Sequence, residues 1–519
     1  MLDLGTSFLA SVARDPDALA LVDGDIRLRY AEWLSKVSSL VMAFDRIGLR
    51  SGDHLLTMLQ NTWQAASVFW ACQLAGLIIT PVNWRVKADE LDYCIENSEG
   101  CALLYQDASK SAVAASARVS SLIVMRAGSE PAAGELSLDA LCNERAGEAL
   151  PRANAEAWSI MFYTSGTTSR PKGVPRRHRA ERAAGIAHVA QNLYRRGERT
   201  LGVMPLYHTM GVRSLISMSL IGGTFVCLPR FDPQQALSLI ASERVTNLYL
   251  VPTLYHDLVH CDAFAQSDIS SVSKLGFAGA PMTDGLLQKL AETFRPDLFV
   301  NHYGSSEIYT FTINQDAAAK PGSAGKAGIN QQVKVVKLNA ASLDQVADVG
   351  EEGEIVALLA GDESFEGYWR RPDADARALR DGWYFTGDTG YVDQDGDLFV
   401  TGRVDDMIIT GGENVSPVEI ESSLSLHPAV LEVAVVGLPD ERWGKVVTAF
   451  VKRGHPVSEQ ELDRYCCDSG LAPFKRPRRF VFVDAIPKST VGKLLRRLLV
   501  AGEYQIETMP PSNAAGTPS

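Results

Sequence analysis

Residues 163–174 read YTSGTTSRPKGV, a stretch that combines small hydroxyl side chains, a glycine and a lysine. Such a stretch can wrap phosphate, because backbone N–H groups approach closely where side chains are small, hydroxyls donate and lysine adds a charge. The loop of P-loop NTPases has glycine directly before the lysine and Ser or Thr directly after it. Here Pro171 precedes Lys172 and Gly173 follows it, so the stretch predicts ATP chemistry of another kind.

The segments on both sides of this stretch predict its place in the fold. An apolar run at 159–163 precedes it and a helical pattern near 180–193 follows it, so we expect the loop on a strand-to-helix turn. Further helical patterns cover 31–48, 63–74 and 88–95, and further strand patterns cover 53–59, 77–81, 201–205, 224–228, 247–251, 275–278 and 298–303. Strands that alternate with helices are typical of a mainly parallel α/β sheet.

The pattern weakens in one segment and changes in another. Residues 107–156 are rich in Ala, Ser and Glu with little periodicity, so we expect them to connect subdomains. Around 327–402 short β-like runs alternate with Gly and Asp turns, which is typical of a smaller antiparallel subdomain. We therefore expect an α/β fold: a large N-terminal domain with parallel α/β sheets and a small β subdomain (1–404), an α+β C-terminal domain (405–505) and a disordered tail (506–519).

Composition and charge narrow the classes of protein. The chain has 519 residues and a net charge of −12, which argues against a nucleic-acid partner. The basic runs at 176–179, 475–479 and 496–497 remain open to two interpretations, a solvated face or contacts with the phosphates of a small ligand. The eight cysteines form no CxxC pair, no secretory signal pattern is present, and no apolar run reaches the roughly 18 residues of a membrane span. We expect a cytoplasmic protein without a membrane partner.

Eight stretches follow one another in a recognisable order. They are LAGLIITPVNWRVKADEL (74–91), YTSGTTSRPKG (163–173), MPLYHTMG (204–211), FAGAPM (277–282), NHYGSSE (301–307), YFTGD (384–388), GRVDDMIITGGENVSPVEIE (402–421) and PKSTVGK (487–493). From about residue 25 to about residue 500 the chain resembles the adenylate-forming superfamily of acyl-CoA synthetases, peptide-synthetase adenylation domains and luciferases. Within it, the chain looks most like aryl-CoA ligases of the benzoate and chlorobenzoate type.

The resemblance implies a reaction in two halves. A carboxylate attacks the α-phosphate of ATP, which gives acyl-AMP and pyrophosphate, and the thiol of CoA then displaces AMP to give a thioester. Because the first half brings an anion to a polyanion, positive charge and a metal must screen it. The implied partners are a small carboxylic acid, ATP, Mg²⁺ and CoA, and the oligomeric state stays open, with a homodimer as one assembly.

The resemblance also assigns a nucleotide site. The loop 164–172 is expected to hold the β- and γ-phosphates, although Ser169 stands where the family usually has glycine. Glu307 matches the metal ligand of the family, and a carboxylate suits Mg²⁺, with Thr164 as its expected companion. Tyr303 is expected to pack on adenine, and Asp388 to accept from both ribose hydroxyls. The full expected set is Thr164, Ser165, Gly166, Thr167, Thr168, Lys172, Gly279, Ala280, Pro281, His302, Tyr303, Gly304, Ser306, Glu307, Asp388, Arg403 and Lys493.

The resemblance places the two half-reactions on different faces of a mobile C-terminal domain. Lys493 is expected to carry adenylation, since a lysine can bridge the carboxylate and the α-phosphate. Asp405 matches the hinge about which that domain turns. The face with Gly411 and Gly412 is then expected to replace the Lys493 face, and glycines suit a tunnel wall where the pantetheine arm slides past backbone.

Three more residues match positions that hold the CoA nucleotide in the aryl-CoA ligases. They are Trp443, Phe474 and Arg476, and an aromatic stack beside a phosphate-pairing arginine suits that role. The alternative for Trp443 is a place in the core, and for Arg476 a solvated position.

The residues expected around the acid are mostly apolar and mix small with bulky groups. His208 is expected to gate the carboxylate and take part in catalysis, and the others are Met210, Gly211, Ala184, Ile186, Gly279, Ala280, Pro281, Gly304 and Tyr309. This set fits a compact, flat acid such as benzoate, a substituted benzoate or 2-furoate. One alternative is a short- or medium-chain fatty acid.

Two further alternatives belong to other functional classes. An amino-acid-adenylating enzyme would carry an acidic residue in the stretch HTMGVRSL (208–215), which has none. A nucleotide-binding regulator without turnover would not need Lys493, Glu307 and Asp388 together.

Overall fold

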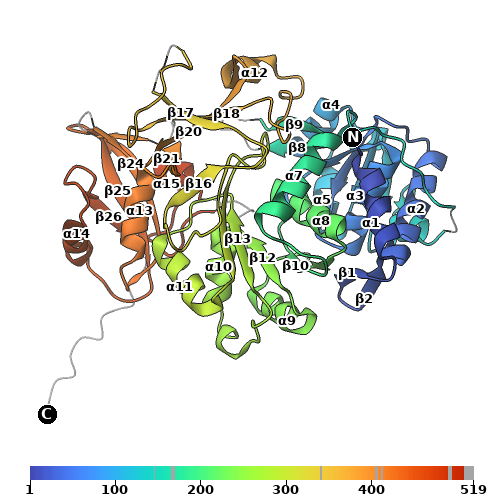
Figure 1. Cartoon of the computed structure of the whole chain (residues 1–519), viewed down its shortest axis with the longest axis horizontal. Coiled ribbons are helices and arrows are strands. Elements are labelled where there is room, and N and C mark those ends of the chain that lie inside the picture. The colour runs from blue at the N-terminus through green and yellow to red at the C-terminus, as the bar shows by residue number, and fades with distance from the viewer. Residues whose placement is uncertain are drawn as a thin grey trace.

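The computed structural model describes residues 1–144, 147–164, 170–338, 340, 342–403, 407–410, 413–488 and 494–507. Two large sheets with helices between them form an N-terminal unit, and a third sheet forms a smaller C-terminal unit, orange to red in Figure 1. The predicted α/β class is confirmed. Within the described residues, every helix is too short or too polar to cross a bilayer.

A seven-stranded sheet carries the phosphate-loop stretch at its edge. Its order is β7–β6–β5–β3–β4–β8–β9, and its strands are β3 (His54–Met58), β4 (Ile78–Pro81), β5 (Ala102–Tyr105), β6 (Ile123–Arg126), β7 (Leu136–Ser137), β8 (Trp158–Thr164) and β9 (Lys172–Arg177). All neighbours are parallel except β8 and β9. The expectation that 107–156 only connects subdomains is wrong, because β6 lies within it and extends the sheet beside β5.

The strands β8 and β9, which flank the phosphate-loop stretch, form an antiparallel hairpin. Thr164 pairs with Lys172 and Trp158 with Arg177 across the antiparallel strands β8 and β9. The expected strand-to-helix turn is therefore wrong, and α7 (His178–Gln191) begins only after β9. Pro175 is tolerated within β9 because this strand lies at the edge of the sheet, where the N–H of every second residue points away from the neighbouring strand.

The second sheet has fourteen strands and changes from parallel to antiparallel along its width. Its parallel strands are β1 (Leu19–Asp23), β11 (Thr224–Cys227), β10 (Arg199–Gly202), β12 (Asn247–Leu250), β13 (Lys274–Ala278) and β14 (Leu298–Tyr303), with the antiparallel β2 (Ile26–Arg29) at the edge. Its antiparallel strands are β15 (Thr312–Asn314), β16 (Ser323–Ala327), β21 (Leu398–Arg403), β20 (Trp383–Val392), β18 (Gly353–Leu358), β17 (Val333–Lys337) and β19 (Leu379–Arg380). The β-rich segment near 327–402 is thus antiparallel as predicted, but β15 and β16 join it to the parallel strands in one sheet.

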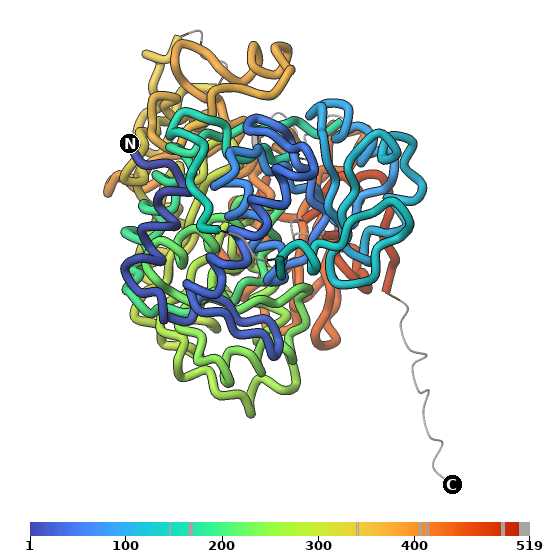
Figure 2. Tube along the Cα trace, turned by 90° about the vertical axis from the view of Figure 1, so that its right-hand side faces the viewer, coloured from blue at the N-terminus to red at the C-terminus, as the bar shows by residue number. Residues whose placement is uncertain are grey.

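The helices between the two sheets carry little polar surface. All 13 residues of α3 (Trp63–Ala75) are buried, and α8 (Thr209–Ile221) is buried along most of its length. A helix that is apolar on every side must be covered on every side, which a place between two sheets provides. The helices α1 (Leu4–Arg14) and α2 (Tyr30–Arg46) pack beside them. Figure 2 shows the blue N-terminal segment against the green one, as the pairing of β1 with β11 requires.

Shorter helices cover the outer surfaces of the N-terminal unit. They are α4 (Ala88–Ser98), α5 (Lys110–Ala115), α6 (Leu138–Cys142), α9 (Pro233–Glu243), α10 (Pro252–Val259), α11 (Asp284–Phe294) and α12 (Pro372–Ala378). Apolar side chains of α9, α10 and α11 share one core with β10, β12 and β13. The parallel part of the fourteen-stranded sheet is therefore covered on both faces, as a parallel sheet requires.

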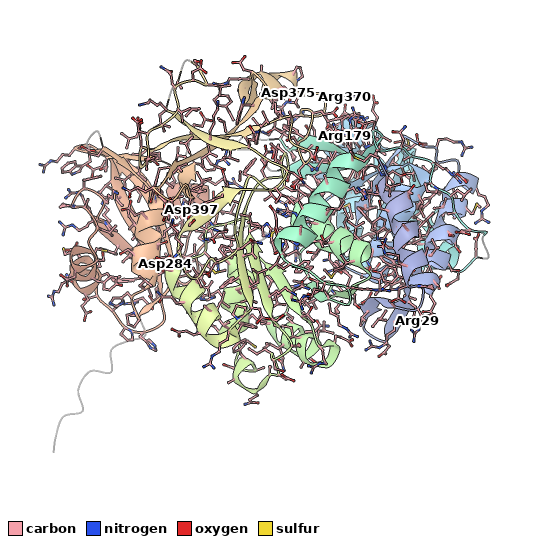
Figure 3. All side chains as sticks on the ribbon, in the orientation of Figure 1. Arg29, Arg179, Asp284, Arg370, Asp375 and Asp397 are labelled. Carbon is pink, nitrogen blue, oxygen red and sulfur yellow. The ribbon has the colours of Figure 1, made fainter. Side chains whose placement is uncertain are left out.

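The C-terminal unit has its own five-stranded sheet. Its strands are β22 (Ile408–Thr410), β23 (Glu413–Val415), β24 (Val430–Asp440), β25 (Gly444–Arg453) and β26 (Arg479–Phe482), and its helices are α13 (Pro417–Ser425), α14 (Glu459–Asp468) and α15 (Arg496–Val500). The helix α13 packs against α11, whose first residue, Asp284, is labelled in Figure 3.

The folded part of this unit extends past the start of the expected disordered tail. Residues 404–406, which include the expected boundary, lie outside the described residues. The expected disordered tail began at 506, but Ile506 bridges to Val483, and Glu507 pairs with Arg453 at 2.7 Å. These two residues therefore belong to the folded unit.

Candidate active site

Lys172 and Glu307 approach each other around the ring of Tyr368, a residue absent from the expected set. The Lys172 ammonium lies 4.1 Å from the centre of this ring, and the Tyr368 hydroxyl donates to Glu307 Oε1 at 2.7 Å. Burial lowers the pKa of Lys172 below its ordinary 10.5, while Glu307 acts in the opposite direction. Because Lys172 belongs to β9 and Glu307 follows β14, the two sheets bring a cation and a carboxylate to one place.

Asp388 collects two donors from the fourteen-stranded sheet. The Tyr303 hydroxyl donates to Asp388 Oδ2 at 2.5 Å, and Arg403 Nη1 lies 3.0 Å from Oδ1. Asp388 and Arg403 are paired residues of β20 and β21, and Tyr303 ends β14. Burial and the nearby Asp388 charge raise the pKa of Tyr303 well above its ordinary value, so this phenol remains a donor at neutral pH. The three residues expected at the adenosine are thus in contact with one another.

A tight turn places Glu307 after β14. A Cβ atom at Gly304 would lie only 2.0 Å from the carbonyl oxygen of Tyr309, so the turn admits no side chain there. The Ser305 hydroxyl accepts from the N–H groups of Glu307 and Ile308 at 3.2 and 3.3 Å. The turn is therefore closed by its own hydrogen bonds, and it exposes only 6% of Glu307.

The residues expected around the acid do not all lie on one side of their helices. His208 caps α8, where its Nδ1 accepts from the N–H of Met210 at 3.4 Å. Ala184 and Tyr309 are each 2% exposed, whereas Ile186 is 42% exposed. Residues two positions apart on a helix with 3.6 residues per turn point to nearly opposite sides. Ile186 therefore faces away from Ala184, and its assignment to the same pocket is corrected.

The glycines of this expected set suit close backbone approach. A Cβ atom at Gly211 would lie 2.3 Å from the carbonyl oxygens of Met204 and Pro205, so α8 can begin against this strand end only with glycine there. Gly279 follows β13 with a left-handed φ of +84°, ahead of Ala280 and Pro281.

His302 lies on the other face of its strand from Tyr303. Successive residues of a strand point to opposite sides of the sheet, and the His302 ring packs against His188 and Tyr249, with centres 5.1 and 5.2 Å apart. Its Nε2 lies 3.2 Å from Asn192 Oδ1. Burial holds the pKa of His302 well below its ordinary value, so the ring is neutral. The structure thus does not bring this side chain to Tyr303 and Asp388.

The residues expected at CoA lie on the surface of the C-terminal unit. The guanidinium groups of Arg442 and Arg478 lie 4.9 and 4.4 Å from the centre of the Trp443 ring. Phe474 is 38% exposed, and the Arg476 guanidinium contacts Cys467 Sγ. Trp443 is therefore not a core residue, which favours the ligand interpretation over the core alternative. The remaining expected residues, Ser165, Gly166, Thr167, Thr168, Asp405, Gly411, Gly412 and Lys493, lie outside the described residues, as does Ser169.

The few oxygen atoms that the protein offers near Glu307 suit an Mg²⁺ ion that substrate phosphates also bind, rather than an ion enclosed by protein ligands alone. Mg²⁺ is usually held by one or two carboxylates together with substrate phosphates, and Glu307 with the Thr164 hydroxyl offers hard oxygen atoms of that kind. In the part of the chain that the structure describes, one group of three carboxylates meets, away from Glu307, at Asp393, Asp395 and Asp397. Lys320 pairs with all three at 2.6 to 2.8 Å, so an ammonium already neutralises that group.

Two residues at this site, Tyr368 and Arg176, were not predicted from the sequence. Tyr368 belongs to no motif, and Arg176 was placed in a basic run with two interpretations, neither of which its fully buried side chain fits. The neighbouring Arg177 pairs with Glu366 on the surface. The period of two along β9 puts Lys172, Val174 and Arg176 on one face, and this is the signal that could have linked Arg176 to the site.

Comparison with known proteins agrees with this geometry. The AMP-binding enzyme family matches residues 8–369, and its C-terminal domain matches residues 419–493. The 4-chlorobenzoate–CoA ligase of Arthrobacter sp. is 35% identical over 94% of this chain and 93% of its own length. The long-chain-fatty-acid–CoA ligase FadD13 of Mycobacterium tuberculosis is 31% identical over 92% of this chain and 93% of its own.

A solved structure gives the same result. The anthranilate CoA ligase AuaEII in complex with anthranoyl-AMP is 25% identical, with a TM-score of 0.90 over 96% of this chain and 97% of that one. Since the family matches cover both units and the relatives cover nearly the whole chain, the chain belongs to the AMP-binding enzyme family and is an AMP-forming acid–thiol ligase.

Proposed function

We propose that this ligase joins a small aromatic or heteroaromatic acid, similar to benzoate or 2-furoate, to CoA. The observation that carries the proposal is the fixation of Tyr309, an expected wall of the acid pocket. The guanidinium groups of Arg176 and Arg213 lie 3.9 and 4.9 Å from the centre of its ring, and its hydroxyl donates to Glu181 at 2.8 Å. A side chain fixed by two cations and a hydrogen bond cannot easily retreat to make room for a long chain, which favours a compact acid.

The activities of two similar proteins support an aromatic acid. One acts on 4-chlorobenzoate and the other was solved with anthranoyl-AMP. The FadD13 relative acts on long-chain fatty acids, so a linear acid is the alternative that a test must include.

The chain's own residues supply the steps of adenylation. Lys172 holds the leaving pyrophosphate, and Asp388 with Tyr303 and Arg403 holds the adenosine. Glu307 and Thr164 would hold Mg²⁺, which when bound screens the phosphate charge from the incoming carboxylate. We assign the approach of the carboxylate to His208 and the charge that develops at the α-phosphate to Lys493.

The second half-reaction uses the C-terminal unit. Trp443, Phe474 and Arg476 would hold the CoA nucleotide, and the backbone at Gly411 and Gly412 would line the path of the pantetheine arm after rotation about Asp405. The proposal also includes a cytoplasmic location and action without nucleic acid or membrane as partner, which the net charge of −12 supports for nucleic acid.

A panel of acids tests the proposal. Pyrophosphate release and thioester formation are measured with benzoate, substituted benzoates, 2-furoate, and linear acids of four to eight carbons. We expect the highest kcat/KM with an aromatic or heteroaromatic acid. A preference for hexanoate or octanoate over every aromatic acid would refute the aromatic assignment, and release of no pyrophosphate with any acid would favour a regulator. Analytical ultracentrifugation in the same preparation tests the homodimer.

A further inference from the structure

Arg176 is a fully buried cation on the strand that carries Lys172. Its side chain and that of its ion-pair partner Glu181 are both 0% exposed. Moving two charges out of water costs several kcal/mol per ion, so a buried pair is a poor device for stability alone. Its other contacts therefore indicate what the pair holds in place.

The Arg176 guanidinium joins two further segments of the chain. Nη1 donates to the carbonyl oxygens of Ser306 and Glu307 at 3.2 and 3.0 Å, and Nη2 donates to that of Glu363 at 2.8 Å. The first two carbonyls belong to the turn that carries Glu307. The third belongs to the segment that leads to Tyr368, whose hydroxyl bonds the Glu307 carboxylate and whose ring lies beneath Lys172. The Arg176 side chain thus connects the three segments that carry Lys172, Glu307 and Tyr368.

Glu181, the partner of Arg176, contacts Tyr309, an expected wall of the acid pocket. Glu181 Oε1 accepts from Arg176 Nε, and Glu181 Oε2 accepts from the hydroxyl of Tyr309 at 2.8 Å. The guanidinium also covers one face of the Tyr309 ring. The ion pair therefore spans from the turn of the metal ligand to the expected wall of the acid pocket, and it touches no solvent on the way.

We propose that Arg176 and Glu181 form a positioning pair that sets Glu307 against Lys172 and Tyr309 against the acid. The part that concerns the acid rests on the proposed function. Neither residue touches a reacting atom, and both act through the backbone or side chain that they hold. A lysine at 176 would keep the charge but lose the planar fork that serves four acceptors at once.

The first test measures binding without turnover. ATP binding is followed by calorimetry over a range of Mg²⁺ concentrations, without acid or CoA, for the wild-type enzyme, Arg176→Met, Arg176→Lys and Arg126→Met. Arg126 is the matched control, because its side chain is 9% exposed and pairs with Asp107 at the far end of the seven-stranded sheet. We expect the half-saturating Mg²⁺ concentration to rise at least about tenfold in Arg176→Met and less in Arg176→Lys, with no change in the control.

The outcomes separate this inference from the proposed function. An unchanged Mg²⁺ dependence in Arg176→Lys and Arg176→Met, with a lowered melting temperature alone, would make the pair merely structural and overturn the inference. If Arg176→Met does not fold, Arg176→Lys against the control gives the same comparison. Failure of the wild-type enzyme to bind ATP with Mg²⁺ would instead refute the proposed nucleotide site.

A double-mutant cycle tests the link to the acid. Glu181→Gln and Tyr309→Phe are compared singly and together in the KM of the best acid. Glu181→Gln replaces the charged acceptor of the Tyr309 hydroxyl by a neutral amide, and Tyr309→Phe removes the hydroxyl itself, so both changes act on the same hydrogen bond. We expect each single variant to raise that KM by about three- to tenfold and the double variant to add little. Multiplicative effects of the two changes would overturn the coupling.

Discussion

The substitution Asp388→Asn gives the sharpest test of the nucleotide site. Tyr303 contacts one oxygen of the carboxylate and Arg403 the other, and a carboxylate, with about four lone-pair positions, can also accept from the ribose hydroxyls. An amide keeps one acceptor oxygen and turns an NH₂ donor toward either Arg403 or the ribose, both of which also donate. Loss of one charge-assisted hydrogen bond costs about 1.5–3 kcal/mol, so ATP binding should weaken by roughly 10- to 150-fold.

The assay compares ATP with its 2′-deoxy and 3′-deoxy analogues. Calorimetric Kd values are measured for the wild-type enzyme, Asp388→Asn and Asp393→Asn, the last a control in which a carboxylate of the same sheet loses only its pairing with Lys320. The wild-type enzyme and the control should bind ATP more tightly than at least one deoxy analogue. In Asp388→Asn the ratio should approach one, since the acceptor is gone.

A full preference for ATP over both analogues in Asp388→Asn would refute this reasoning. It would show that the ribose hydroxyls are recognised elsewhere and that the contact of Asp388 with Tyr303 and Arg403 serves only the sheet. A weaker binding of ATP and of both analogues by one common factor would lead to the same conclusion.

Three other predictions concern lysines and the hinge. Burial lowers the pKa of Lys172 below 10.5, so ATP affinity should decline as the pH rises through that lowered value. Lys172→Arg should shift this decline to higher pH, because arginine stays protonated. The Kd of ATP is measured from pH 7 to 10.5, and the same decline in both proteins would exclude Lys172 as its cause. Lys493→Ala should nearly abolish acyl-AMP formation yet spare thioester formation from supplied acyl-AMP, and an equal loss of both would contradict the assignment. Asp405→Pro should impair thioester formation more than adenylation, and separate rate measurements that find adenylation more affected would remove the hinge.

The parts of the fold that sequence predicts best are those with strong apolar patterns. The strand predicted at 298–303 is β14 to the residue, because it begins with the buried apolar run Leu298–Val300 and ends at the motif residues His302 and Tyr303. The strand β9 was missed because KGVPRR contains a proline and two arginines, and only the burial of Arg176 against Glu181 makes that sequence an acceptable strand. The strand β6 was missed because its short apolar run stands in a segment that is otherwise rich in Ala, Ser and Glu.

Some residues of the site could be predicted from the sequence and others could not. Motif order predicts Lys172, Glu307 and Asp388, which the structure places in two adjoining groups. Tyr368 could not be predicted, because its place depends on a contact between distant segments, where the N–H of Trp369 donates to the carbonyl of Gly173 at 2.9 Å. Ile186 was assigned wrongly although its helix was predicted correctly, because the helical period was not applied to the choice of pocket residues.

The self-contained sheet of the C-terminal unit has a consequence for dividing the enzyme. Among the described residues, β22 to β26 pair only with one another, so a break in the chain after residue 403 would interrupt no strand pairing of the larger unit. Lys172, Glu307 and Asp388 would remain on one fragment, and the stretch with Lys493 would lie on the other. The two fragments could then be produced as separate polypeptides and mixed, so that recovery of ligase activity would report how well the α11–α13 contact reunites them without a covalent link.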